Sequence, residues 1–290
     1  MRSQDISIFR RTFIKEREGG VCMVGFPGID DVIESVTAPY KKELVLQLPI
    51  RYRFNREKML MSWSTPEAHI IDIDPCYGYD DHFSSNISTP REEIILKDKN
   101  SLSCLVAAVC EMAVVEQMHP TLSFPRPEQT SSMLEHFITL YDQTLSIWRD
   151  DIMKKHWPDL FSLRCAYRNM YLIQGFNEAF HYGGNANEMH EILYSLAQLK
   201  ATTERHQDEC PAFETIQEQS PQLAINLTMP IQKWKEMPRM TTNPEQNIQQ
   251  YFQSISQVLE EASFKGTASC ERTNGSYHWH LKHKDEEIVM

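Results

Sequence analysis

Apolar side chains recur at every third or fourth position through most of the chain beyond residue 100. This spacing matches the 3.6 residues of a helical turn and is typical of helices that bury one face. It predicts five amphipathic helices, over residues 102–113, 133–148, 160–174, 189–199 and 248–259. Gly183 and Gly184 would end the third helix, and Asn187 would cap the fourth. With prolines in the connections, the pattern is that of a helical bundle.

The first hundred residues follow a different pattern. Residues 19–40 are rich in glycine and proline, which predicts loops. Residues 44–54 alternate apolar and polar side chains, which predicts a strand, and Pro49 would place it at the edge of a sheet. Residues 69–79 begin with a second short apolar run of the same character.

The length of 290 residues is enough for one domain with a sizeable core. We expect residues 1–100 to form an atypical, loop-rich N-terminal region with short strands or helices. We expect residues 101–290 to form the helical part of the same continuous domain.

The net charge of −11 argues against nucleic acid or an anionic membrane as a partner. The seven cysteines show no Cys-x-x-Cys spacing, and no apolar run is long enough for a signal peptide or a membrane span. Reduced thiols in the cytoplasm are the simplest interpretation.

Two separated segments carry a more specific signal. Residues 160–184 (LFSLRCAYRNMYLIQGFNEAFHYGG) read as a helix followed by glycines, and residues 274–281 (NGSYHWHL) place Gly275 four positions before Trp279. Together they resemble the back half of a class I terpene cyclase, and more narrowly the fungal trichodiene synthase family. The resemblance covers roughly residues 101–284. It implies an all-α, terpenoid synthase-like helical bundle.

The activity implied by this resemblance is that of a sesquiterpene cyclase of secondary metabolism. Such an enzyme would ionise farnesyl diphosphate with Mg²⁺ as cofactor. The metal ions need carboxylate ligands in two facing clusters, and Arg or Lys side chains add charge-assisted hydrogen bonds to the phosphate oxygens. The carbocation that remains needs a dry aromatic pocket.

The first metal motif of the family is aspartate-rich, and Asp80 and Asp81, in the sequence DDHF, match a shortened form of it. Counting back from Phe161 indicates a rival position after the apolar segment 102–115. There the carboxylate would come from Glu116. Both positions stay open at this stage.

The second metal motif, N-D-x-x-S-x-x-x-E, has its best match in residues 228–236 (TMPIQKWKE). The resemblance assigns metal-binding positions to Thr228, Gln232 and Glu236. Thr228 stands where the family has Asn and Gln232 where it has Ser, so only one of the three is a carboxylate. Pro230 would disturb a helix here.

The resemblance assigns the diphosphate to four cations. Arg164 and Arg168 lie one turn apart on the helix over 160–174, and Lys235 precedes Glu236 as in the family. Near the C-terminus the family has Arg-Tyr, whereas this chain has Asp285-Glu286, which leaves Lys284 as the candidate there.

Two other metal constellations are visible in the sequence. His278, His280 and His283 lie within six residues, and neighbours at i and i+2 share a face in a strand. Residues 116–119 and 178–181 both show the Glu-x-x-His spacing of di-iron helical bundles.

A second functional hypothesis comes from the departures from the family motifs. It makes the chain a catalytically inactive terpene synthase-like protein, or an unrelated helical interaction protein. Magnesium-dependent binding of a diphosphate distinguishes the two hypotheses. A homodimer is compatible with either.

Overall fold

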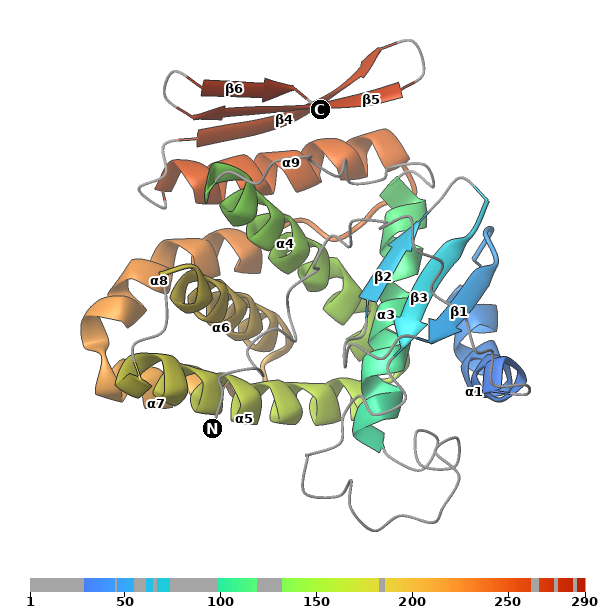
Figure 1. Cartoon of the computed structure of the whole chain (residues 1–290), viewed down its shortest axis with the longest axis horizontal. Coiled ribbons are helices and arrows are strands. Elements are labelled where there is room, and N and C mark those ends of the chain that lie inside the picture. The colour runs from blue at the N-terminus through green and yellow to red at the C-terminus, as the bar shows by residue number, and fades with distance from the viewer. Residues whose placement is uncertain are drawn as a thin grey trace, which may run out of the picture.

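The computed structural model describes residues 29–44, 46–54, 61–64, 67–73, 99–118, 132–182, 186–261, 266–273, 276–283 and 286–289. These residues form eight helices and six strands (Figure 1). The described part is therefore mostly helical, as the hydrophobic pattern predicts. None of its helices is both long and apolar enough to cross a membrane.

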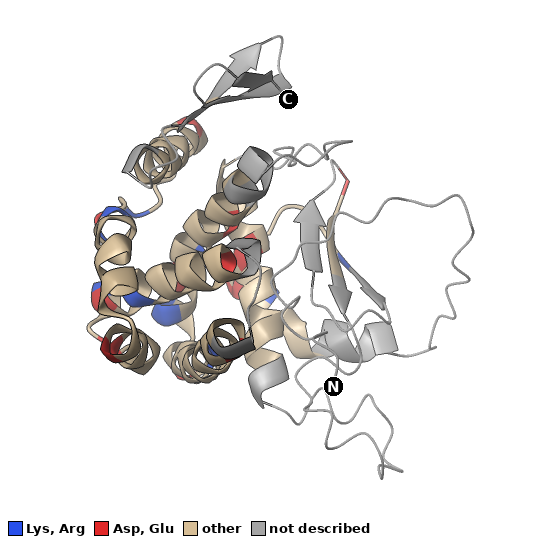
Figure 2. Ribbon diagram, turned by 60° about the vertical axis from the view of Figure 1, so that its left-hand side comes forward, with Lys and Arg blue, Asp and Glu red and all other residues tan. Residues whose placement is uncertain are grey.

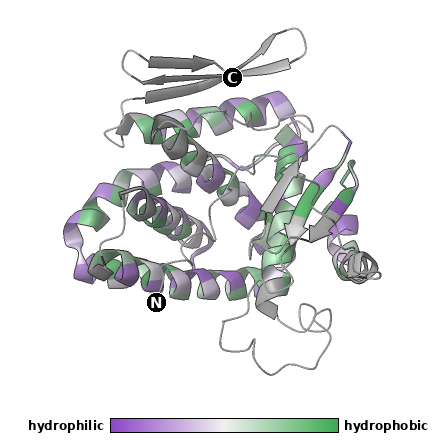
Figure 3. Ribbon diagram, viewed as in Figure 1, coloured by the Kyte–Doolittle hydropathy of each residue, from purple (hydrophilic) through white to green (hydrophobic). Residues whose placement is uncertain are grey.

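All five predicted helices are confirmed, and each extends beyond its predicted range. They are α3 (Lys99–Met118), α4 (Ser132–His156), α5 (Pro158–Tyr182), α6 (Ala186–His206) and α9 (Pro244–Glu261). Residues 103–115 of α3 are buried without interruption, and the helix is pale to green in Figure 3. Because α3 is buried on all sides over these residues, it lies at the centre, between the N-terminal elements and the bundle.

Two further helices occupy a stretch that the hydrophobic pattern did not assign. They are α7 (Pro211–Gln219) and α8 (Pro221–Lys235), and each begins with a proline. At the first position of a helix, proline loses no intrahelical hydrogen bond and its fixed φ suits the helix. Pro158 and Pro244 begin α5 and α9 in the same way. Pro158, Pro211 and Pro221, which were expected in connections, are thus helix starts. Pro230 lies inside α8 without ending it.

The N-terminal region begins, in the described part, with helix α1 (Ile29–Leu44). The expectation of loops over residues 19–40 is therefore wrong from residue 29 onward. The strand predicted over residues 44–54 is confirmed only in its second half, as β1 (Ile50–Phe54), because Leu44 ends α1. The start of the segment 69–79 is the strand β3 (His69–Ile73), and its remaining residues lie outside the described part. A further strand, β2 (Met61–Ser64), joins them. The sheet order is β1-β3-β2, with β1 parallel and β2 antiparallel to β3. Residues of this sheet and of α3 share a small core: Ile50, Ile71, Leu105, Ala108, Val109 and Met112.

The C-terminal residues form a second sheet that packs on α9 (Figure 1). Its strands are β4 (Gly266–Thr273), β5 (Ser276–His283) and β6 (Glu286–Val289), antiparallel and in that order. Most of the segment 274–281, which carries the family resemblance, is strand β5. The all-helical expectation did not include this sheet.

Aromatic side chains with a polar group fill the centre of the bundle. The Tyr251 hydroxyl donates a hydrogen bond to the carbonyl of Tyr141 (2.6 Å), and the two rings meet edge to face at 5.2 Å. The indole N–H groups of Trp148 and Trp234 also have acceptors, at 2.7 and 2.9 Å. Satisfying these buried donors lets large aromatic rings pack in the core without a desolvation penalty.

We predict that Gly175→Ala, inside α5, stabilises the protein by about 0.5–1 kcal/mol. Alanine has a higher helix propensity than glycine and reduces the entropy of the unfolded chain. A Cβ at this position would meet Ile192 at 3.7 Å, which is an ordinary van der Waals distance. Urea denaturation of the wild type and the variant measures the change. A loss of stability would show that the α5–α6 contact is tighter than this distance implies.

Candidate functional site

The interior of the bundle contains a network of charged side chains built around Asp150 on α4. This aspartate is 1% exposed. One carboxylate oxygen accepts a hydrogen bond from Arg149 Nε at 2.9 Å. The other accepts from Arg168 Nη1 at 3.3 Å and from Gln198 Nε2 at 3.1 Å. Three side chains therefore donate hydrogen bonds to one buried carboxylate: one from the neighbouring residue on α4, one from α5 and one from α6.

Two other helices extend this network. Arg149 also reaches Glu111 on α3, with Nη1 at 3.5 Å from Oε2. On α6, Gln198 accepts a hydrogen bond from Arg168 and donates one to Thr202 Oγ1 at 2.8 Å. Side chains from α3, α4, α5 and α6 thus meet in one buried polar cluster.

The charges within the cluster determine its protonation. Burial alone would raise the pKa of Asp150, but the charges of Arg149, Arg168 and Arg164 outweigh it and hold the pKa below its usual value. Burial lowers the pKa of Arg168 to about 10, so its guanidinium stays protonated at neutral pH. The cluster therefore contains a true ion pair in the core.

The buried thiols beside this network are not activated. Burial raises the pKa of Cys165 to about 12 and raises that of Cys110 as well. A nucleophilic cysteine needs a thiolate near neutral pH. These two cysteines therefore act as small buried side chains and not as nucleophiles.

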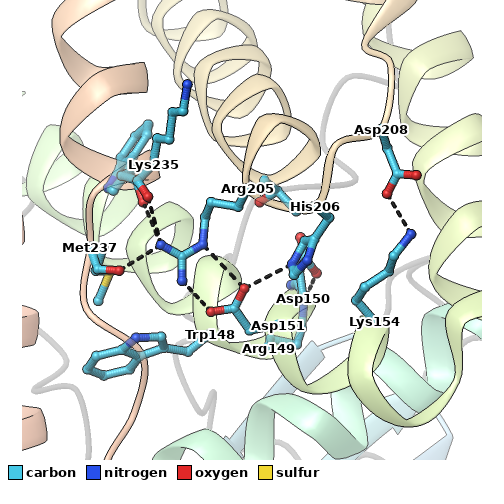
Figure 4. A network of polar contacts seen from close by, with 12 residues as sticks. Trp148, Arg149, Asp150, Asp151, Lys154, Arg205, His206, Asp208, Lys235 and Met237 are labelled. Carbon is cyan, nitrogen blue, oxygen red and sulfur yellow. Dashed lines mark hydrogen bonds and ion pairs between the residues drawn. The ribbon is translucent and has the colours of Figure 1, made fainter.

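The next residue, Asp151, anchors a second network (Figure 4). It binds Arg205 through both carboxylate oxygens, and His206 Nε2 lies 2.9 Å from Oδ1. Burial would raise the pKa of Asp151, but the hydrogen bonds from His206 and Arg205 keep it below its usual value.

Arg205 in turn caps the C-terminal end of α8. Its Nη1 group donates to the carbonyls of Lys235 and Met237, at 2.9 and 2.6 Å. The last carbonyls of a helix have no intrahelical partner and carry partial negative charge, so a guanidinium is a favourable cap. Asp151 orients that guanidinium, and the pair holds the end of α8 against α4 and α6.

The structure places the predicted residues of the second metal motif on the exposed side of α8. Thr228, Gln232 and Glu236 are all exposed, whereas the opposite side of the helix is buried. Thr228 Oγ1 donates to the carbonyl of Ala224 at 3.5 Å, and Gln232 Nε2 donates to Glu236. Magnesium needs near-octahedral oxygen ligands and is usually held by carboxylates. Three residues in a row along one exposed helix face, with one carboxylate already bonded, do not fit that ion.

The predicted cations lie in two different places. Arg168 is buried with Asp150, and Arg164, whose Nη1 lies 3.5 Å from Cys104 Sγ, is close enough to affect the pKa of Asp150. Lys235 instead forms a surface ion pair with Glu204 of α6 at 2.8 Å. Asp80, Asp81 and Lys284 lie outside the described residues.

Glu116, the rival for the first metal position, has a different role. Its carboxylate accepts hydrogen bonds from the backbone N–H groups of Gln47 and Leu48, at 2.8 and 2.7 Å. His69 Nε2 donates to it at 2.7 Å. These bonds tie the N-terminal sheet to α3, so Glu116 is used as a structural acceptor. Of the second Glu-x-x-His segment, Glu178 accepts a hydrogen bond from Gln174 at 3.0 Å. The side chains of His119 and His181 lie outside the described part, so the di-iron spacing stays a prediction.

Sequence reasoning did not single out the residues that organise both networks, Asp150, Asp151 and Arg205. A signal was available, because Arg149, Asp150 and Asp151 interrupt an otherwise apolar helical pattern immediately after Trp148. Charged residues in phase with a buried face need partners in the interior. Their partners on other helices could not be identified from that signal.

Among the side chains that the structure describes, no group of three His, Cys, Asp or Glu residues could hold a metal ion. No protein-family model, curated protein or solved structure matches this chain.

We predict that Asp150→Asn destabilises the protein by about 3–5 kcal/mol, because it leaves buried arginines without their counter-charge. The matched control is Glu218→Gln on the exposed side of α7, which should change stability by less than about 0.5 kcal/mol. Chemical denaturation at neutral pH measures both. Equally small losses of stability in the two variants would show that the arginines find other partners when Asp150 is neutralised.

We predict that stability falls as the pH is lowered through about 6.5, in part because of His69. Burial lowers the pKa of His69, despite its bond to Glu116, so the unfolded chain takes up a proton that the folded chain does not. The contribution of one such group is at most about 1.4 kcal/mol per pH unit. Denaturation midpoints at pH 7.5 and 5.5 should differ less in His69→Gln than in the wild type. An unchanged difference would assign the acid sensitivity to other groups.

Proposed function

We propose that this chain is a helical interaction protein that does not turn over a prenyl diphosphate. The observation that carries this proposal is the outward side of α8. There the positions expected to bind metal share an exposed surface with large apolar side chains, and they lie on the side of the helix opposite the buried core.

The arginines of the interior support the same proposal. To bind a diphosphate, Arg168 would have to exchange its contact with Asp150 for one with the ligand. The carboxylate of Asp150 would then be buried with less compensation, and breaking a buried ion pair costs several kcal/mol. The geometry is that of a structural pair.

The surface of α8 has the mixed character of a protein interface. Ile225 is 63% exposed and Met229, one turn later, is 39% exposed. Thr228 and Gln232 lie beside them and offer polar contacts. Apolar anchors among uncharged polar groups are typical of interface surfaces. Figure 2 shows acidic and basic residues interspersed on the described helices, so such a partner would not be selected by a field of one sign.

A second candidate function is the sesquiterpene cyclase implied by the sequence resemblance, acting on farnesyl diphosphate with Mg²⁺ in the cytoplasm. Two observations favour it. Three arginines, Arg149, Arg164 and Arg168, lie near enough to the buried carboxylate of Asp150 to lower its pKa, so positive charge gathers at this point of the bundle. In addition, Nε of Arg168 is buried and has no hydrogen-bond partner among the described residues. A diphosphate would offset the positive charge of the arginines, and one of its oxygens would accept a hydrogen bond from Nε of Arg168. Asp80 and Asp81 would then have to supply the carboxylates that α8 lacks.

Incubation of the purified protein with farnesyl diphosphate, in Mg²⁺ or in EDTA, distinguishes the two functions. We expect no terpene by headspace gas chromatography–mass spectrometry in either buffer, and none with geranylgeranyl diphosphate. A known sesquiterpene cyclase serves as the positive control. A magnesium-dependent hydrocarbon or alcohol would overturn the interaction proposal, and its loss in Asp81→Ala would then assign the first metal position.

Thermal denaturation with a non-hydrolysable farnesyl diphosphate analogue tests binding without turnover. We expect no magnesium-dependent rise in Tm. A ligand at a thousandfold excess over its Kd would add about 4 kcal/mol, which is readily measured. A clear rise that Arg168→Met removes, after correction for that variant's own stability, would support a diphosphate site.

A further inference from the structure

The outward side of α8 is symmetric about the middle of the helix. Opposite the buried Leu227, which is 5% exposed, it presents two large apolar residues and two amides: Ile225, Met229, Gln222 and Gln232. At about 100° per residue, all four lie within about 40° of the direction opposite Leu227. The two apolar residues are each two positions from Leu227, and the two glutamines are each five positions from it. A second α8 running in the reverse direction therefore presents the same order of apolar and amide side chains.

This symmetry is the property that a surface needs in order to bind its own copy. In a contact with two-fold symmetry, residue i of one copy meets residue j of the other, and j meets i. When two α8 helices pack antiparallel, Ile225 of each copy lies at the level of Met229 of the other. Gln222 lies in the same way at the level of Gln232, and amide groups can donate and accept hydrogen bonds with each other. A partner of a different sequence would not require this symmetry.

The outward side of α8 also lacks the charges that would keep two copies apart. No residue from Gln222 to Gln232 is charged, and Asn226 and Thr228 add exposed polar groups on the two flanks. Each chain has a net charge of −11, so two copies repel each other elsewhere on their surfaces. A contact through an uncharged helix face brings no like charges together and buries no charge without a partner. Two acidic copies can therefore meet through this side of α8.

A second pair of exposed apolar residues, on α5, does not form such a surface. Met170 is 58% exposed and Phe180 is 54% exposed. They are ten positions apart, which is about 15 Å along the helix axis, so they do not form one contiguous patch. Ile225 and Met229 are one turn apart and lie on the same side of α8, which is at the edge of the bundle (Figure 1). The larger continuous apolar contact is therefore available on α8.

We propose, on the basis of the function proposed above, that the partner of α8 is a second copy of this chain. The two α8 helices pack antiparallel about a two-fold axis at the level of Leu227. Each helix has 15 residues, and a contact between one such helix from each copy is at the small end of protein interfaces, below about 1,200 Å² in total. Interfaces of this size are typical of transient association, so the dimer should dissociate on dilution.

Sedimentation velocity of the purified full-length chain, over a series of micromolar concentrations, tests the proposal. We expect a monomer–dimer equilibrium in the wild type. Ile225→Lys and Met229→Glu should each raise the Kd of the dimer by more than about tenfold, because the two-fold axis places each unpaired charge in the contact twice. Added salt should not weaken the dimer, because the contact contains no ion pair.

An equimolar mixture of the Ile225→Lys and Met229→Glu chains tests the antiparallel register. In a mixed dimer the introduced lysine of one copy meets the introduced glutamate of the other, while the second apolar pair is unchanged. We expect the mixture to dimerise more tightly than either variant alone. A mixture that stays as monomeric as its two components would contradict the antiparallel arrangement.

Met170→Glu is the matched control, because it replaces an exposed apolar residue by a charged one on α5. It should leave the Kd of the dimer unchanged, with circular dichroism confirming that every variant is folded. A wild type that is monomeric throughout the series would overturn the proposal, and so would a dimer that Met170→Glu disrupts and Ile225→Lys does not. The terpene assay decides the proposed function separately. A dimer that produces a terpene would overturn that function and not the dimer, and a monomer that produces none would do the reverse.

Discussion

The ion pair between Asp150 and Arg168 is the contact on which the arrangement of the bundle depends. A buried carboxylate and a buried guanidinium are tolerated only when each has its counter-charge and its hydrogen bonds. Here those partners come from α3, α4, α5 and α6, so the four helices must keep one relative register for the network to close. Apolar packing alone would permit sliding of one helix along another, whereas the directional bonds around Asp150 permit one alignment.

The consecutive residues Asp150 and Asp151 transmit this constraint to the rest of the molecule. Asp150 accepts the hydrogen bonds of the buried network, and Asp151 binds Arg205, which caps α8. The position of α8 is therefore tied to α4 through two neighbouring side chains. With its apolar side held against α6, α8 presents Thr228 and Gln232 outward. The same packing that stabilises the bundle thus leaves the outer side of α8 exposed.

Only part of the candidate site, and none of its connections, could be found from the sequence. Arg164 and Arg168 stand out as cations on a helix, and Glu116 as a carboxylate after an apolar segment. Their partners could not be predicted, because Asp150, Gln198 and His69 come from other elements. Spacing along one helix says which residues share a face, and it contains no information about which face of another helix they meet.

The hydrophobic period by itself determined that the chain is mostly helical, where its five longest helices after residue 100 lie, and that two strands occur in the N-terminal region. These features follow from which residues must leave water, and that information is local. Only the tertiary structure decided the roles of the charged residues. Whether an arginine is a ligand for substrate, a cap or half of a buried ion pair depends on what lies across from it, and that is set by the packing of elements distant in sequence.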